Sequence, residues 1–201
     1  MLSALIIACG ACLGGKMGSM ADLQTRPRKT VDDFMRLPEG TLAELIDGEI
    51  FTSAAPRVPH QGVILNLAVA LKAFADRGAF GQVLLSPMDV HLPSGDIVEP
   101  DLIFVRRENL AIIQDWVRGV PDLLVEVLSP SHPERDLIVK RELYARNGVG
   151  EYWIVDPDDR SVQILKLSGN RYEPAGYRKG RQALVTDLLP GLTLAVESLF
   201  D

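Results

Sequence analysis

Two acidic residues, Asp101 and Glu126, lie within short apolar runs of the kind that form buried β-strands. Asp101 lies in the run 97–105, and Glu126 lies in the run 122–128. An unpaired buried carboxylate is costly, so each acid must be hydrogen-bonded, protonated or bound to a cation. Mg²⁺ takes oxygen ligands and keeps several waters, so two carboxylates and a backbone carbonyl would suffice to bind it. We therefore predict a divalent-cation site at Asp101 and Glu126.

Each acid also has a purely structural explanation. Asp101 follows Pro100 and could be a turn residue bonded to the backbone, while Glu126 could pair with Lys140 or Arg141. Lys140 lies near the centre of an apolar helical stripe, where an unpaired lysine is rare. Its ammonium could reach Glu126 and polarise a water or a phosphate oxygen, or it could snorkel to the helix edge. The pattern alone leaves both alternatives open.

Further polar residues stand near these elements. His60 heads the apolar face of a predicted helix, where a histidine is more often a capping or core residue than a catalyst. Because it follows a hairpin that carries Glu44 and Glu49, a position in a cleft is plausible. Asp136 precedes Lys140 by one helical turn and is expected to pair with it.

Apolar spacing and turn signals predict the elements that position these residues. Thr30 caps a short helix that ends near Leu37, and Asp47-Gly48 joins two strands in a hairpin. Two long helices and five strands are expected after it: helices at 60–77 and 133–147, and strands at 82–92, 97–105, 123–128, 151–155 and 162–167. The core order is therefore helix, three strands, helix, strand. This order predicts an α/β fold around a mixed sheet, with added N- and C-terminal hairpins.

The bulk composition is that of one globular domain. The chain has 201 residues and a net charge of −6, which does not favour a protein that coats nucleic acid. Residues 1–20 are interpreted as a disordered or artefactual extension, with a signal peptide as the alternative, and residues 21–201 as a single domain. Both cysteines fall in the first dozen residues, so the domain suits a reducing cytosol. We expect a cytoplasmic protein with no membrane association.

With Pro100-Asp101, Glu126-Val127-Leu128 and Lys140 in that order, the chain resembles the PD-(D/E)XK nuclease superfamily. More narrowly, it is similar to the Uma-type putative restriction endonuclease family, through stretches that cover about Leu42 to Leu167. The resemblance implies a restriction-endonuclease-like fold and cleavage of DNA phosphodiesters with Mg²⁺, or with Mn²⁺ in its place.

Carried over by position, the resemblance makes Asp101 and Glu126 the metal ligands. Two residues after Glu126 stands Leu128, where the superfamily motif has lysine, and Lys140 is expected to take that role. Glu49 is the candidate for the further acid that such nucleases often supply from the first element.

Three functions compete. The acid pair favours a metal-dependent DNA endonuclease, whereas the acidic net charge favours a catalytically silent nucleic-acid-binding or regulatory module on the same fold. A hydrolase of small phosphoesters is the third. For the endonuclease we expect a homodimer, because cutting both strands requires two sites.

Overall fold

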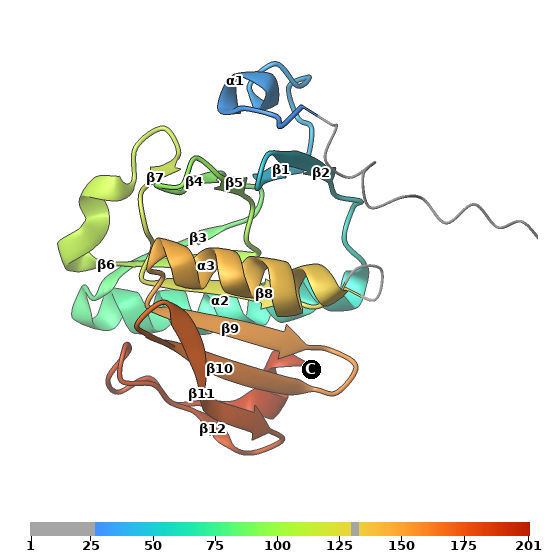
Figure 1. Cartoon of the computed structure of the whole chain (residues 1–201). Coiled ribbons are helices and arrows are strands. Elements are labelled where there is room, and N and C mark those ends of the chain that lie inside the picture. Colours follow the sequence, from blue (N-terminus) through green and yellow to red (C-terminus); the bar gives the residue numbers. More distant parts are fainter. Residues whose placement is uncertain (1–26, 130–132) are drawn as a thin grey trace, which may run out of the picture.

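The computed structural model describes residues 27–129 and 133–201, so the expected extension at residues 1–20 lies outside the described part. Within that part, the central sheet is mixed and has the order β11-β10-β9-β8-β6-β3 (Figure 1). Its strands are β3 (Gly81–Leu85), β6 (Leu102–Arg106), β8 (Leu123–Val127), β9 (Glu151–Asp156), β10 (Ser161–Ser168) and β11 (Arg171–Lys179). Neighbours are antiparallel except β8 and β9, which are parallel.

One long helical segment covers each face of this sheet, as the sequence predicts. The helix α2 (Val58–Gly78) packs through Leu67 and Leu71 onto Phe104 and Trp153. On the other face, the π-helical turn η3 (Arg135–Lys140) continues directly into α3 (Arg141–Asn147) and connects β8 to β9. A crossover between parallel strands requires such a helical connection. The predicted order of helix, strands, helix, strand is confirmed.

The helix α2 is also, among the described residues, the one helix long and apolar enough to cross a membrane by length and composition. The core helix of a globular protein passes the same test, and α2 buries Val63, Leu67, Leu71 and Phe74 against the sheet.

A second, smaller sheet has the strand order β2-β1-β5-β4-β7 (Figure 1). Its strands are β1 (Ala43–Ile46), β2 (Glu49–Thr52), β4 (Val90–His91), β5 (Ile97–Val98) and β7 (Val117–Arg118). The predicted hairpin is confirmed, because Asp47 and Gly48 take the positive φ angles of 52° and 79° that a tight two-residue turn needs. The predicted capping by Thr30 is also confirmed, at α1 (Val31–Phe34).

Two of the predicted strands are wrong as continuous elements. The run 82–92 divides into β3 and β4, and the run 97–105 divides into β5 and β6, with one part of each in either sheet. Pro87 lies in the first break and Pro100 in the second. Proline has no N–H to give to a ladder, so it interrupts a strand inside a sheet. Asp101 therefore stands immediately before β6 and not inside a strand.

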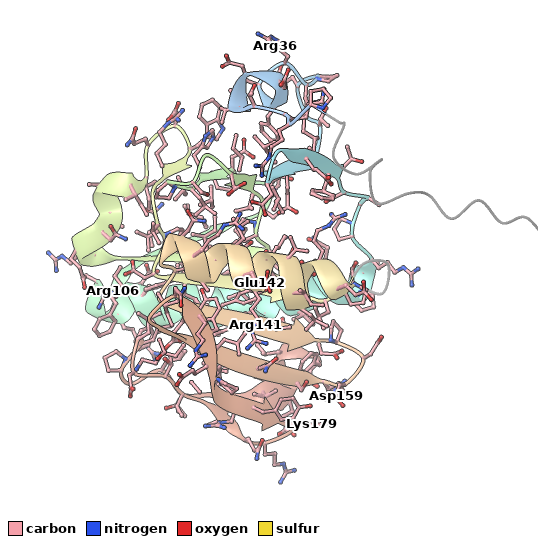
Figure 2. The ribbon with its side chains drawn as sticks, in the orientation of Figure 1. Arg36, Arg106, Arg141, Glu142, Asp159 and Lys179 are labelled. Atoms are coloured by element: carbon pink, nitrogen blue, oxygen red, sulfur yellow. The ribbon has the colours of Figure 1, made fainter. Side chains whose placement is uncertain are left out.

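The remaining elements close the fold. A 3₁₀ helix, η2 (Arg107–Ile112), follows β6 directly, and the predicted C-terminal hairpin of β9 and β10 is extended by β11. Figure 2 shows Asp159 and Lys179 together at one end of this hairpin, where they form an ion pair. The chain ends with β12 (Ala183–Leu184), β13 (Leu194–Ala195) and η4 (Val196–Leu199), which pack on the α2 side.

Gly81 lies where β3 approaches β6 closely, so a substitution at this position tests the observed packing of the two strands. A Cβ atom at Gly81 would lie 2.2 Å from the carbonyl oxygen of Val105, which is backbone and cannot swing away. We expect Gly81→Ala to lower the free energy of unfolding by about 1–3 kcal/mol, as overpacking does. Urea denaturation followed by circular dichroism measures it.

The matched control is Gly62→Ala in α2, where a Cβ would meet nothing within 4 Å. Alanine in a helix interior is better than glycine by roughly 0.5–1 kcal/mol, so this variant is expected to be at least as stable as the wild type. A Gly81→Ala protein as stable as Gly62→Ala would contradict the observed packing.

Candidate active site

A cavity of about 410 Å³ opens where the two sheets separate. Its walls come from β1, the start of α2, the end of β8, the turn η3 and the turn between β9 and β10, which converge on one side of the molecule (Figure 1). Asp101, Glu126, Lys140 and His60 line this cavity, whereas Glu49, the other acid proposed from the sequence for the site, does not.

Asp101 reaches the cavity from the break before β6. Leu102 of β6 pairs with Val125 of β8, so one step further along the antiparallel ladder Asp101 stands opposite Glu126. Its Oδ2 atom accepts a hydrogen bond of 2.7 Å from the backbone N–H of Val127 and lies 3.3 Å from Nε2 of His60. The predicted backbone hydrogen bond of Asp101 is therefore present, and the acid still faces the cavity.

Glu126 projects from β8 toward η3 and α3. Its Oε1 atom accepts hydrogen bonds from Nζ of Lys140 at 2.9 Å and from the hydroxyl of Tyr144 at 2.7 Å. The side chain of Lys140 is only 6% exposed. The prediction that its ammonium reaches Glu126 is confirmed, and the snorkelling alternative is wrong.

Lys140 also binds two further carboxylates. Its Nζ atom lies 2.9 Å from Oε1 of Glu44 and 3.5 Å from Oδ1 of Asp136, so the expected Asp136–Lys140 pair is confirmed. Because a π-helical turn is wider than an α-helical one, η3 changes which residues share a helix face. Asp136 and Lys140 both face the site, and the hydroxyl of Tyr152 donates to the backbone carbonyl of Asp136.

The electrostatics of this cluster follow from burial. Burial alone would lower the pKa of Lys140, but the carboxylates of Glu126, Glu44 and Asp136 outweigh it and hold that pKa well above its usual range. Burial raises the pKa of Glu126 in spite of Lys140, and the neighbouring acids raise it further. The cluster therefore places one ammonium among three acidic side chains, Glu44, Glu126 and Asp136.

The pKa of His60 depends on its partner Asp101. Burial lowers its pKa, but the hydrogen bond and the charge of Asp101 together raise it above the ordinary value. Its second ring nitrogen, Nδ1, is buried and has no hydrogen-bond partner within the described residues.

Comparisons with known proteins identify the family of the chain. Residues 31–197 match the model of the family Uma2, described as "Putative restriction endonuclease". This match spans most of the chain. The chain belongs to the Uma2 family.

A solved structure described as a "putative nuclease belonging to DUF820", from Anabaena variabilis, has the same fold. It superposes with a TM-score of 0.72 at 18% sequence identity, over 85% of this chain and 97% of that one. Together with the element order, this likeness shows the restriction-endonuclease-like fold that the resemblance implies. Among curated proteins, none matches the chain.

The structure of this Uma2 protein brings Glu44, and not Glu49, to the cluster. Both residues flank the same turn, but Glu49 lies exposed on β2, whereas Glu44 lies buried on β1 beside Lys140. The backbone N–H of Glu99 donates to Glu44 at 3.0 Å, and Glu99 itself lines the cavity. Burial, with help from the charges of Asp89 and Glu44, raises the pKa of Glu99 to about 7. The signal that could have found Glu44 is the one that marks Glu126, an acid inside an apolar run.

Within residues 27–129 and 133–201, no group of three or more His, Cys, Asp or Glu side chains is arranged to hold a metal ion. The role of Asp101 and Glu126 as metal ligands therefore stays a prediction.

The buried ammonium makes a strong prediction about stability. Lys140→Met leaves Glu44 and Glu126 buried without their cation, and breaking a buried pair in this way costs roughly 3–5 kcal/mol. We expect that loss in the free energy of unfolding at neutral pH, measured by urea denaturation.

The matched control is Lys72→Met, which removes an exposed pair with Asp76 on α2. Such a pair contributes at most about 0.5 kcal/mol. Equal effects of the two substitutions would show that Lys140 does not neutralise the buried acids.

Proposed function

We propose that this protein is a metal-dependent endonuclease that hydrolyses DNA phosphodiester bonds in the cavity between its two sheets. The observation that carries the proposal is the convergence of Asp101, from the break just before β6, and Glu126, from β8, beside the ammonium of Lys140. The family description and the fold of the Anabaena protein support a nuclease.

The donor set suits a hard divalent cation such as Mg²⁺ or Mn²⁺. Carboxylate oxygens are its preferred ligands, and one or two of them with waters suffice for Mg²⁺. Within the described residues, Lys140 and Tyr144 donate to Oε1 of Glu126, and Val127 and His60 contact Oδ2 of Asp101. Asp101 and Glu126 would hold the ion through their other oxygens. When bound, it would lower the pKa of a water and neutralise charge on the phosphoryl group.

The protein's own groups set the geometry of that site. Lys140 and Tyr144 fix the carboxylate of Glu126 from one side, while Val127 and His60 fix that of Asp101. Fixed ligands avoid reorganisation as charge develops, which is the main source of electrostatic catalysis. Lys140 also supplies the one ammonium within this cluster that could steady the attacking water or the developing phosphoryl charge.

The direct test is nicking of supercoiled plasmid DNA with Mg²⁺ or Mn²⁺. We expect metal-dependent nicking by the wild type and its reduction by about a hundredfold or more in Asp101→Asn and Glu126→Gln, because each removes a fixed charge from the reacting centre. The control is Asp187→Asn, an exposed acid that pairs with Lys166 outside the cavity and whose loss should leave the rate unchanged.

Activity that survives Asp101→Asn would eliminate this mechanism. DNA binding without metal-dependent nicking would instead support the catalytically silent module.

Metal binding gives a second, independent measurement. Titration calorimetry with Mn²⁺ is expected to show binding to the wild type and to Asp187→Asn. In Asp101→Asn a neutral amide replaces one ligand, and we expect at least about tenfold weaker binding. Wild-type affinity in Asp101→Asn would place the cation elsewhere.

A further inference from the structure

The groups proposed to act on the phosphodiester lie deep in the protein. Glu44, Glu126 and Lys140 are 2%, 3% and 5% exposed, and the side chain of Asp101 is 16% exposed. A reacting phosphate must enter the cavity to approach them. The phosphates of a stiff duplex stay along its outer edge, whereas an unpaired strand can bend into the cavity and bring a phosphate to these groups.

The size of the cavity sets how much nucleic acid can enter. About 410 Å³ is within the range of pockets that enclose one small ligand, roughly 300–1,000 Å³. It has room for a single nucleotide with its phosphate. A duplex, whose major groove alone is about 12 Å wide, is too large to enter the cavity and would remain outside it.

The charge of the lining also disfavours a duplex. Among the described residues, six acidic side chains line the cavity, against one lysine, two arginines and one histidine: Glu44, Glu99, Asp101, Glu126, Asp136 and Asp158, against Lys140, Arg57, Arg135 and His60. A duplex brings twice as many phosphates per length as a single strand. An anionic cavity therefore repels a duplex more strongly and must gain affinity from contacts other than phosphate neutralisation.

Such a contact is available in the cavity wall. The guanidinium of Arg135 lies 4.7 Å from the centroid of the Phe51 ring and lines the cavity. A guanidinium plane supported by a ring is a surface on which a nucleobase can stack. A planar group of this kind matches the face of an unpaired base, which a duplex hides.

We propose that the substrate of this site is an unpaired DNA strand, either single-stranded DNA or an unpaired end or bubble, with one base stacked on Arg135. This inference rests on the proposed nuclease function and specifies its substrate class. The cavity admits one nucleotide of the unpaired strand, and the scissile phosphate then lies against Asp101, Glu126 and Lys140.

The test compares cleavage by the full-length wild type, with Mn²⁺, of fluorescein-labelled oligonucleotides of one sequence. The substrates are a single strand, a blunt duplex, a duplex with an unpaired overhang and a duplex with a central bubble. We expect cleavage within unpaired segments to be about tenfold faster or more than in the blunt duplex, as the stacking of one base would provide. Equal or faster cleavage of the blunt duplex would overturn the inference and leave the nuclease function intact.

Arg135→Lys separates stacking from charge, because lysine keeps the positive charge but lacks the planar group. We expect it to reduce the preference for the single strand over the duplex, while Arg181→Lys, at an exposed arginine paired with Glu197, leaves the preference unchanged. An unchanged preference in Arg135→Lys would remove Arg135 from the proposal.

Binding of the labelled oligonucleotides to the metal-free wild type, measured by fluorescence anisotropy, tests the substrate class separately from the nuclease function. If no substrate is cleaved with any metal, the nuclease function fails. A single strand that still binds about tenfold more tightly than the duplex, in an Arg135-dependent way, would uphold the substrate class. Equal binding of both, or binding of neither, would overturn it.

Discussion

The buried ammonium of Lys140 is the interaction on which the site depends. It connects Glu44 of the smaller sheet, Glu126 of the central sheet and Asp136 of the π-helical turn. Removing charges from water costs several kcal/mol per ion, and only good geometry offsets that cost. The hairpin, the central strand and the helix must therefore meet at one place, and the pair Asp101–His60 is held at the edge of the same cavity.

Two prolines interrupt the strands beside the site, and the cavity lies at this interruption. At Pro87 and Pro100 the chain passes from one sheet to the other, so the sheets separate where Asp101 stands. Continuous strands would fill this region with ladder hydrogen bonds and apolar side chains. Because the ladder stops, Asp101 can accept the N–H of Val127 and still reach a cavity.

Much of this site is predictable from local sequence, and its limits are physical. Asp101, Glu126 and Lys140 stand out because charge inside an apolar run requires a partner, and the structure brings them together. Glu44 also lies inside an apolar run, but the sequence does not show which strand of the hairpin is covered, because the pairing of β1 with β5 decides that. Pro87 and Pro100 mark the two breaks in the sequence, but the division of the strands between two sheets depends on tertiary pairing. The π-helical turn has no sequence signal of its own.

The excess of carboxylate over ammonium explains how a chain with a net charge of −6 could act on a polyanion. An acidic protein gains little from general attraction to phosphates, so affinity must come from a few local contacts. Buried carboxylates around one lysine are stabilised further by a second cation, and that cation would also neutralise the phosphate brought to the site. If the protein has the proposed function, this excess of acidic side chains favours the binding of a divalent cation and weakens the binding of a continuous duplex. Stacking of a base then discriminates between substrates.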